Sequence, residues 1–419
     1  MPPTSHRVIF LNRFFYPDHS ATSEILSDLA FTLSGHGFTT KVVTSRLRYD
    51  DPNDLLPRHE VIDGVEMFRV RTSHWGRRNP IGRVLDYATF YLTAGAWLWR
   101  LVRRNDIIVA KTDPPLISVV AACIAKLRQA KLVNWQQDIF PEVAQALSIG
   151  GSMGRAVFGL LRFPRDWSLR RACRNVVLGE RMAQTLRGLA IPDERLALIA
   201  NWSDGKRIYP VAPNENPLRA AWNLTNTFVV GYADNLGRAH DIETILPVIK
   251  EFDRAPRSEG SPRVMFLFVG GGALRSTLED EVKRCNFTNV VVRDYQPREQ
   301  LAATLSAADV HLVSLNPKLE GLIVPSKIYA IAAAGRPAIF IGDPDGEVAR
   351  IITEADIGFT VPTANSEALG HRILELLRKP QLAAEMGERA RRAFEQHWDR
   401  QIAFKKWEGI LRAPQVGTQ

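Results

Sequence analysis

Short runs of valine, isoleucine and leucine alternate with helical patterns along almost all of this 419-residue chain. Runs that are apolar at nearly every position are typical of strands buried on both faces, whereas half-exposed strands alternate apolar with polar residues. Strands buried in this way form parallel sheets that helices cover on each side. The alternation therefore predicts an α/β protein.

The predicted strands fall into two groups, separated by a segment rich in Asn, Asp and Pro at residues 201–217. The first group comprises Val8–Leu11, Lys41–Thr44, Glu66–Val70, Asp106–Ala110, Lys131–Trp135, Asn175–Leu178 and Leu196–Ile199. The second comprises Phe228–Tyr232, Val264–Val269, Val290–Arg293, Val310–Ser314, Ala338–Ile341 and Gly358–Val361. The chain is too long for one ordinary core, so we expect two doubly wound, Rossmann-like domains that face a central cleft.

Helical patterns connect the predicted strands. They lie near Ser23–Ser34, Gly82–Arg104, Pro115–Leu127 and Arg181–Gly188, with two more in the tail at Gln381–His397 and Arg400–Leu411. We expect a first domain at residues 1–204, a second at 205–397, and a final segment at 398–419 that packs back towards the first domain.

Composition indicates a soluble globular protein, with 45% hydrophobic and 24% charged residues. The three cysteines, Cys123, Cys173 and Cys285, are far apart and odd in number, so they predict neither a disulfide framework nor a metal site. Residues 1–7 lack the apolar core of a signal peptide. These features favour a reducing, cytoplasmic compartment.

The formal net charge of +9 is compatible with nucleic acid, anionic lipid or phosphorylated substrates as partners. Arginines interleave with apolar residues in two first-half segments, Arg77–Arg104 and Arg155–Arg174. Within the first segment, only 13 residues lie between Asp86 and Arg100, fewer than the roughly 20 that a membrane span needs. Val84–Val102 is therefore predicted as a core helix or as a buried helix with an interfacial end.

Three loops of the second half suit an anionic ligand. Glu320–Lys327 places a charged residue at each end of a junction between a loop and a helix N-terminus, as a nucleotide diphosphate would require. In Asp234–Asp241, Gly237 permits a tight turn and Arg238 can donate a bidentate fork to phosphate. Val269–Arg275 lacks the third glycine of a dinucleotide loop, so it is either a close backbone approach to a nucleotide or a plain tight turn.

Several runs, taken in order, resemble a family 4 (group 1) glycosyltransferase of the GT-B fold. They are Gly231–Asp241, Phe268–Arg275, Asn289–Leu301, Ser306–Val310 and Glu320–Lys327, together with Tyr16–Ala30, Ser34–Phe38, Asp113–Pro115 and Trp135–Glu142 in the first half. The resemblance covers nearly the whole chain. It is strongest to the branch that builds bacterial capsules, exopolysaccharides and O-antigens.

The resemblance implies that the second domain binds a nucleotide-sugar donor. Arg238 matches the family's diphosphate-binding basic residue, and Glu320 lies near the first glutamate of its Glu, seven residues, Glu signature. Lys327 stands near the second glutamate, with the spacing one residue short, so we predict that Lys327 reaches phosphate instead of ribose. The predicted nucleotide-binding residues are Ser20, Ala21, Thr22, Gly237, Gly271, Gly272, Tyr295, Gln296, Glu320 and Ser326.

The resemblance also implies that the first domain binds the acceptor. Asp138 and Glu142 flank the carboxyl end of a predicted strand, and Asp138 is predicted to orient or deprotonate an acceptor hydroxyl, with a turn or capping role as the alternative. Asp18 and His19 are further acceptor candidates. The predicted catalytic residues are Asp138, Arg238 and Lys327, and neither a metal nor another cofactor is expected.

We therefore predict a retaining hexosyltransferase that moves a sugar from a nucleotide-sugar to a glycan linked to polyprenyl diphosphate, in bacterial surface polysaccharide or lipopolysaccharide biosynthesis. It is expected in the cytoplasm, associated peripherally with the anionic inner face of the membrane through its arginine-rich first half. Two alternatives remain. A nucleotide-sugar epimerase shares the fold but needs many acid/base residues in its cleft, and a nucleic-acid-binding protein needs basic and aromatic repeats that the sequence lacks.

Overall fold

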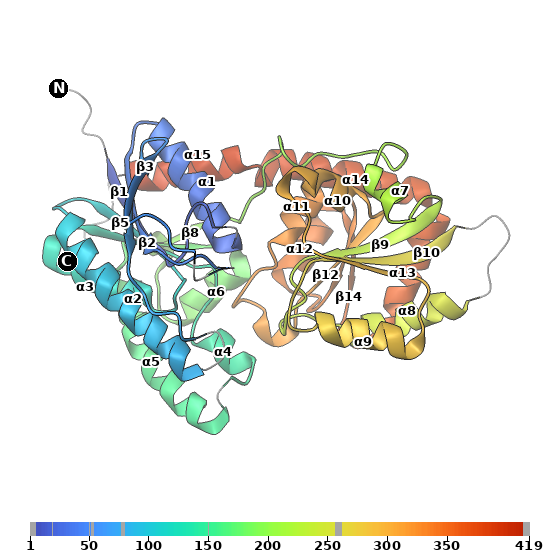
Figure 1. Cartoon of the computed structure of the whole chain (residues 1–419), viewed down its shortest axis with the longest axis horizontal. Helices are drawn as coiled ribbons and strands as arrows, with labels where there is room; N and C mark the ends of the chain where they lie inside the picture. Colours follow the sequence, from blue (N-terminus) through green and yellow to red (C-terminus); the bar gives the residue numbers. More distant parts are fainter. Residues whose placement is uncertain are drawn as a thin grey trace. The chain divides into compact units, whose positions relative to one another are not determined.

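A computed structural model describes residues 6–18, 20–49, 51, 54–76, 80–149, 151–255 and 262–413. The chain divides into two compact units (Figure 1). Unit 1 contains the described residues up to Ala200 and those from Ala403 onward, and unit 2 contains Asn201–Ile402. The first change of unit thus comes slightly before the expected boundary at residue 204, and residues 398–402 belong to unit 2.

The described part of unit 1 contains an eight-stranded sheet in the order β3-β4-β2-β1-β5-β6-β7-β8. Its strands are β1 Arg7–Leu11, β2 Thr39–Ser45, β3 His59–Ile62, β4 Val65–Val70, β5 Ile107–Lys111, β6 Lys131–Trp135, β7 Arg174–Val177 and β8 Leu196–Leu198. Every neighbouring pair is parallel except β3 with β4. Since β2 and β5 lie on opposite sides of β1, a ligand crevice is expected at the carboxyl ends of β1 and β5.

The helices of unit 1 are α1 Ala21–Gly35, α2 Pro80–Leu101, α3 Ile117–Arg128, α4 Glu142–Ala146, α5 Gly151–Arg171, α6 Glu180–Gly188 and the last helix, α15 Arg400–Arg412. Helix α3 contacts both α2 and α5 (Figure 1). In α2, Phe90, Ala94 and Leu98 are spaced four residues apart and fully buried, whereas Leu92 is 75% exposed. Among the described residues, no helix has the length and apolar character that a membrane crossing requires.

Helix α15 starts in unit 2 and ends in unit 1. Its Trp407 is fully buried, and the ring centroid lies 4.6 Å from that of the buried Trp135 at the end of β6. The Arg412 guanidinium lies over the Phe38 ring, 4.8 Å from its centroid. These aromatic contacts attach the C-terminal helix to the N-terminal sheet.

Unit 2 contains, within its described residues, a six-stranded parallel sheet in the order β11-β10-β9-β12-β13-β14. The strands are β9 Thr227–Ala233, β10 Arg263–Val269, β11 Val290–Arg293, β12 Val310–Ser314, β13 Ala338–Ile341 and β14 Gly358–Val361. The helices are α7 Pro217–Ala221, α8 Ile245–Arg254, α9 Arg275–Cys285, α10 Leu301–Ser306, α11 Lys327–Ala333, α12 Glu347–Ala355, α13 Ser366–Arg378 and α14 Pro380–Ala393. Here β10 and β12 flank β9, so the corresponding crevice lies at the carboxyl ends of β9 and β12.

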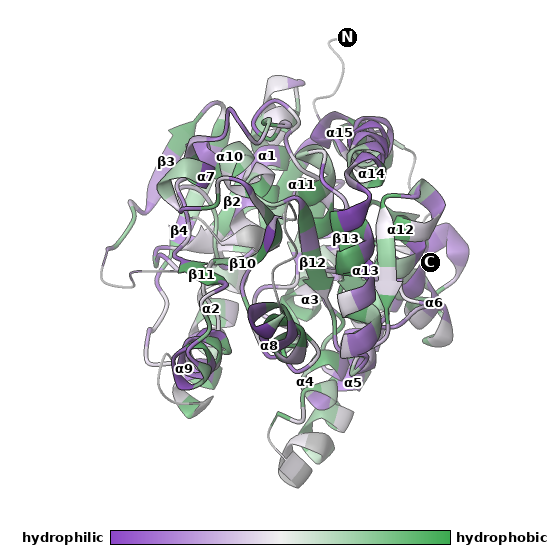
Figure 2. Cartoon of the chain, turned by 90° about the vertical axis from the view of Figure 1, so that its right-hand side faces the viewer, coloured by the Kyte–Doolittle hydropathy of each residue, from purple (hydrophilic) through white to green (hydrophobic). Residues whose placement is uncertain are grey.

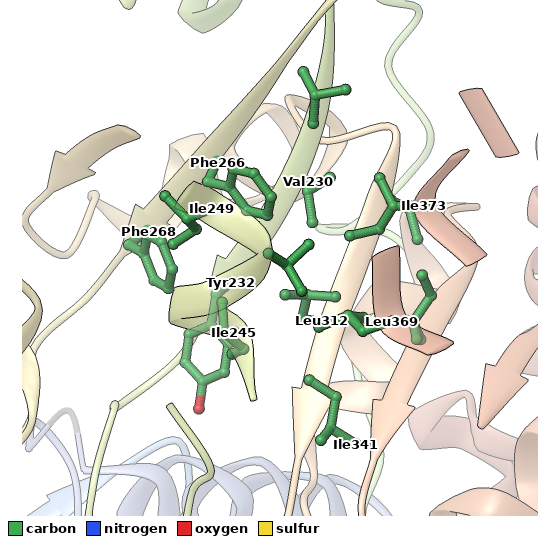
Figure 3. Close-up of a cluster of buried hydrophobic side chains, with 14 of the residues drawn as sticks. Val230, Tyr232, Ile245, Ile249, Phe266, Phe268, Leu312, Ile341, Leu369 and Ile373 are labelled. Carbon is green, nitrogen blue, oxygen red and sulfur yellow. The ribbon is translucent and has the colours of Figure 1, made fainter. Parts of the chain in front are cut away.

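The core of unit 2 lies between this sheet and the helices that cover it. Figure 3 shows side chains from β9, β10 and β12, such as Tyr232, Phe266 and Leu312, packed with Ile245 of α8 and Leu369 of α13. In Figure 2 the strands β10, β12 and β13 are green, and the outward faces of α8 and α9 are purple. The continuous apolar strand runs are thus explained by burial on both faces, and the prediction of two α/β domains is confirmed.

Candidate functional site

Two loops meet at the carboxyl ends of β9 and β12 in unit 2. The carbonyl oxygen of Ser314 lies 2.9 Å from Nδ1 of His240, and the Ser314 hydroxyl accepts the backbone N–H of Asp241 at 3.2 Å. The backbone N–H of Asn316 donates to the carbonyl of Ala239 at 2.8 Å. These bonds hold the loop that carries Arg238 against the segment that leads to Glu320.

Two cations at this edge lack partners among the residues that the structure describes. Arg238 is exposed, and Lys327, the first residue of α11, is half-buried. Neither side chain makes a hydrogen bond or an ion pair with any other residue that the structure describes. Both charges are therefore available to an anionic ligand.

The glycine loop after β10 packs closely on the loop after β9. A Cβ atom on Gly270 would lie 2.4 Å from the carbonyl oxygen of Asp234, and one on Gly272 would lie 2.4 Å from that of Leu236. Both glycines have left-handed φ angles, +136° and +120°. Glycine is thus required at position 272, where the backbones of these two loops cross. This requirement holds whether or not Gly272 also contacts a nucleotide. At Gly237, in contrast, the nearest atom to a Cβ would be 3.8 Å away, and the φ angle is unstrained.

Replacing Gly272 by alanine should lower the melting temperature by several degrees, because forced φ and the backbone clash together cost about 1–3 kcal/mol. Scanning calorimetry is the measurement. Gly237→Ala is the matched control and should leave the transition within about one degree of wild type. Equal melting temperatures for the two variants would contradict the assignment of Gly272 to the crossing.

Three other predicted nucleotide-binding residues lie near the same edge. The Tyr295 ring is 63% exposed and covers Gly271, whose Cβ position lies 3.2 Å from the ring. The Gln296 amide donates to the carbonyl of Asp294 at 2.9 Å. Ser326 precedes α11 and its side chain does not cap that helix. Tyr295 is thus largely exposed beside the glycine loop.

Glu320 has a structural partner that its sequence position did not reveal. Its Oε1 accepts the backbone N–H of Glu347, the first residue of α12, at 2.9 Å, and that of Gly321 at 3.2 Å. Burial raises the pKa of Glu320, although these two hydrogen bonds oppose the shift. The carboxylate thus satisfies an N–H group at the start of α12, which helices otherwise leave unpaired.

Some of the predicted residues just before and at the start of α1 also make structural hydrogen bonds. The Asp18 carboxylate accepts the backbone N–H groups of Ser20 at 2.8 Å and Tyr49 at 2.5 Å, so it joins two loops of unit 1. The Ser20 hydroxyl is buried without a hydrogen-bond partner in the described part of the chain. The carbonyl of Thr22 accepts a bond from Lys111 at 2.7 Å. His19 lies outside the described residues, as does the side chain of Ala21.

A buried lysine lies at the crevice of unit 1. Lys111, the last residue of β5, is 1% exposed, and its ammonium group lies over the Trp135 ring, 4.2 Å from the centroid. It lines a small pocket with Gln136 and Asp138. The Oδ1 atom of Asp138 is buried and has no hydrogen-bond partner among the described residues. The structure thus places the Asp138 carboxylate in this pocket, and its catalytic role stays a prediction.

Two ionisable groups of this pocket, Lys111 and Asp138, and the nearby Asp113 have shifted pKa values. Burial raises the pKa of Asp138 to about 6, and the Thr112 hydrogen bond and the Lys111 charge only partly oppose it. Burial also raises the pKa of Asp113 to about 6, against the charge of Arg13 and with that of Asp138. Burial lowers the pKa of Lys111 to about 7, which the two aspartates oppose. Such opposed shifts are characteristic of functional sites.

Glu142 is held by arginines. Arg165 donates to both carboxylate oxygens, at 2.8 and 2.9 Å, and the Arg162 Nε lies 3.2 Å from Oε1. Arg165 also donates to the carbonyl of Phe140 and is 5% exposed. The structure therefore gives Glu142 a structural partner, and it removes Arg165 from the arginines that could meet a membrane.

Sequence reasoning missed Lys111 and Arg13. A lysine that ends an otherwise apolar strand run, Ile107–Ala110, was the available signal, because a charge is rarely buried without a partner. Arg13 follows β1 and lies 5.4 Å from the centroid of Tyr87. Nothing in its local sequence distinguishes it from a surface arginine.

Two family models match the chain, one to each unit. Residues 22–202 match the glycosyl transferase 4-like domain, and residues 215–393 match the glycosyl transferases group 1. Both descriptions name glycosyl transferases, the class that the sequence favoured over an epimerase or a nucleic-acid-binding protein. The predicted family is confirmed.

Relatives and a solved structure agree with these matches. The chain is 27% identical to the probable glycosyltransferase WbjE of Pseudomonas aeruginosa, over 74% of this chain and 75% of that protein. It is 26% identical to the putative colanic acid biosynthesis glycosyl transferase WcaI of Escherichia coli K12, over 64% and 65%. It shares the fold of Anabaena HepE, solved with UDP-glucose, with a TM-score of 0.71, 16% identity, and coverage of 96% and 99%.

Proposed function

Because this chain belongs to the group 1 glycosyltransferases, we propose that it is a retaining hexosyltransferase that uses a nucleotide-sugar donor. Its acceptor is a glycan on polyprenyl diphosphate, in the biosynthesis of a bacterial surface polysaccharide. The relationship to WcaI, described for colanic acid biosynthesis, supports the polysaccharide. The UDP-glucose complex of HepE supports a nucleoside diphosphate sugar as donor.

The observation that carries this proposal is the pair of unpartnered cations at the carboxyl edge of the unit 2 sheet. Arg238 stands on the loop after β9 and Lys327 on the first turn of α11, which follows the neighbouring strand β12, and no described carboxylate neutralises them. Negative charge accumulates on the nucleoside diphosphate as the glycosidic bond breaks, and fixed cations stabilise that charge. In this proposal the two cations stabilise the charge of the leaving diphosphate in place of a metal ion, and no cofactor is required.

Donor selection is tested by thermal shift with UDP, GDP and dTDP. Selective binding to the folded state should raise the melting temperature with one nucleotide, because the stabilisation grows with ligand concentration over Kd. The preferred nucleotide then defines the nucleotide-sugars for a transfer assay. Absence of stabilisation by all three at millimolar concentration would reject the donor site.

We further propose that the enzyme works on the cytoplasmic face of the membrane, where a surface on α5 contacts anionic lipid. Val157, Leu160 and Phe163 recur every three residues along this helix, and the last two are 77% and 80% exposed. Arg170 and Arg171 follow in its last turn. Exposed apolar side chains beside basic ones are typical of helices that lie in a lipid interface.

Replacing Leu160 and Phe163 together by glutamate should weaken binding to phosphatidylglycerol vesicles at least tenfold, since burial of each side chain in lipid is worth about 1.5–3 kcal/mol. Sedimentation across a salt series is the measurement, and wild-type binding should strengthen at low salt. Leu55→Glu, an exposed position outside α5, is the control. Wild-type protein that binds no vesicles at any salt concentration would remove the membrane from the proposal.

A further inference from the structure

A second and larger pocket opens in unit 1, with about 1230 Å³ of open space. It lies at the carboxyl ends of β1, β2, β4 and β5, and the first turns of α2 form one wall. Side chains from each of these segments line it, among them Arg13, Tyr49, His74, Arg83 and Tyr87. Of the catalytic and binding residues predicted from the sequence, none lines this pocket.

The wall of this pocket next to α2 is firmly built. The Asp86 carboxylate, which is 3% exposed, accepts the Ser73 hydroxyl at 2.7 Å and the backbone N–H groups of Trp75 and Gly76, each at 2.9 Å. A Cβ on Gly76 would lie 2.6 Å from the Cα of Arg83. The segment after β4 therefore packs directly on the helix backbone and holds the start of α2 in place.

The charged residues of the lining are Arg13, Arg48 and Arg83 against Asp86 and Asp113. Arg83 is exposed and makes no ion pair or hydrogen bond with a described residue. Arg13 lies between the Phe14 and Tyr87 rings, at 5.2 and 5.4 Å from their centroids, and its Nε is buried without a hydrogen-bond partner in the described chain. Its closest carboxylate contact is Asp86 at 3.8 Å, and the oxygens of Asp86 already accept three hydrogen bonds.

We infer that this pocket binds the diphosphate of the acceptor, an inference that rests on the function proposed above. Arg13 and Arg83 carry planar donor forks that match phosphoryl oxygens, and each retains donors that no described residue uses. Phe14, Tyr49 and Tyr87 add aromatic faces, on which the apolar face of the first sugar packs. The neighbouring pocket of Lys111 and Asp138 adjoins the same loop after β5 and receives the acceptor hydroxyl.

The test is calorimetric titration of the full chain, without donor, with decyl diphosphate below its critical micelle concentration. Wild type should bind, and Arg83→Gln and Arg13→Gln should each weaken the affinity about tenfold, the effect of one lost charge-assisted contact. Arg100→Gln, an exposed arginine on the last turn of the same helix, is the matched control and should bind as wild type. Arg238→Ala should also bind as wild type, which excludes occupation of the unit 2 loops.

Two further titrants identify the source of the affinity. Inorganic pyrophosphate should compete with decyl diphosphate but bind more weakly, and uncharged decyl maltoside should not compete. Arg83 makes no hydrogen bond or ion pair within the described chain, so Arg83→Gln should fold normally. An unchanged affinity of this variant for decyl diphosphate would therefore overturn the inference, even if Arg13→Gln is poorly folded. Competition by decyl maltoside would overturn it as well. Failure of the proposed transferase function would appear instead as absence of nucleotide stabilisation, which this titration does not measure.

Discussion

Arg238→Ala and Lys327→Ala should each lower kcat by about two orders of magnitude or more, the usual effect of removing one electrostatic stabiliser of a transition state. The reason is the absence of any described internal partner, which leaves both charges for the departing nucleoside diphosphate. Initial rates with saturating donor, identified by thermal shift, are the measurement.

Arg254→Ala and Lys250→Ala are matched controls for this experiment. Both residues are exposed cations of unit 2 on α8, away from the loops after β9 and β12. They should retain wild-type rates within about twofold, because exposed charges at a distance are largely screened. If the site variants are as active as these controls, the assignment of Arg238 and Lys327 is wrong.

Asp138→Asn should lower kcat by about 10²–10⁴, the range for loss of a general base. Since Asp138 is protonated below its raised pKa of about 6, wild-type kcat should fall as pH decreases through this value. The variant, having no carboxylate at this position, should lose most of that pH dependence. A pH profile from about 4.5 to 8 measures both effects, and calorimetry should show near-normal nucleotide affinity because Asp138 lies in unit 1.

The thermal stability of Asp138→Asn distinguishes a catalytic role of Asp138 from a structural one. A carboxylate whose folded pKa is raised stabilises the fold when protonated, and that contribution is lost as pH rises from about 4 to 6. A neutral asparagine avoids this loss, so at pH 7 Asp138→Asn should be as stable as wild type or more so. Asp193→Asn, at an exposed position whose carboxylate pairs with Arg187, should leave activity unchanged and lower stability only slightly, because exposed ion pairs contribute little. A marked drop in the melting temperature of Asp138→Asn would indicate a structural role instead.

Local sequence pattern was sufficient for the fold and for some of the residues of the candidate site. Continuous apolar runs specify strands buried on both faces, so the two α/β domains and nearly all their strands were predictable. The exception, β3, is a short edge strand with alternating burial, and its apolar content is too low to mark it. Arg238, Lys327 and the glycine loop could also be identified from the sequence, because turns and helix starts depend on residues close in sequence.

Tertiary structure determined which polar side chains remain free, since hydrogen-bond partners come from distant segments. The partner of Lys111 is the carbonyl of Thr22, 89 residues away, and Arg165 reaches Glu142 across 23 residues. Glu320 reaches the start of α12 across 27 residues. A sequence pattern carries no record of such pairings, so it could not distinguish Glu142 and Glu320, whose carboxylates are hydrogen-bonded, from Asp138. The apolar run before Lys111 indicated a buried lysine, but not that Asp138 lies beside it. Only the folded arrangement, in which every buried polar group must find a partner or pay for its desolvation, made that distinction.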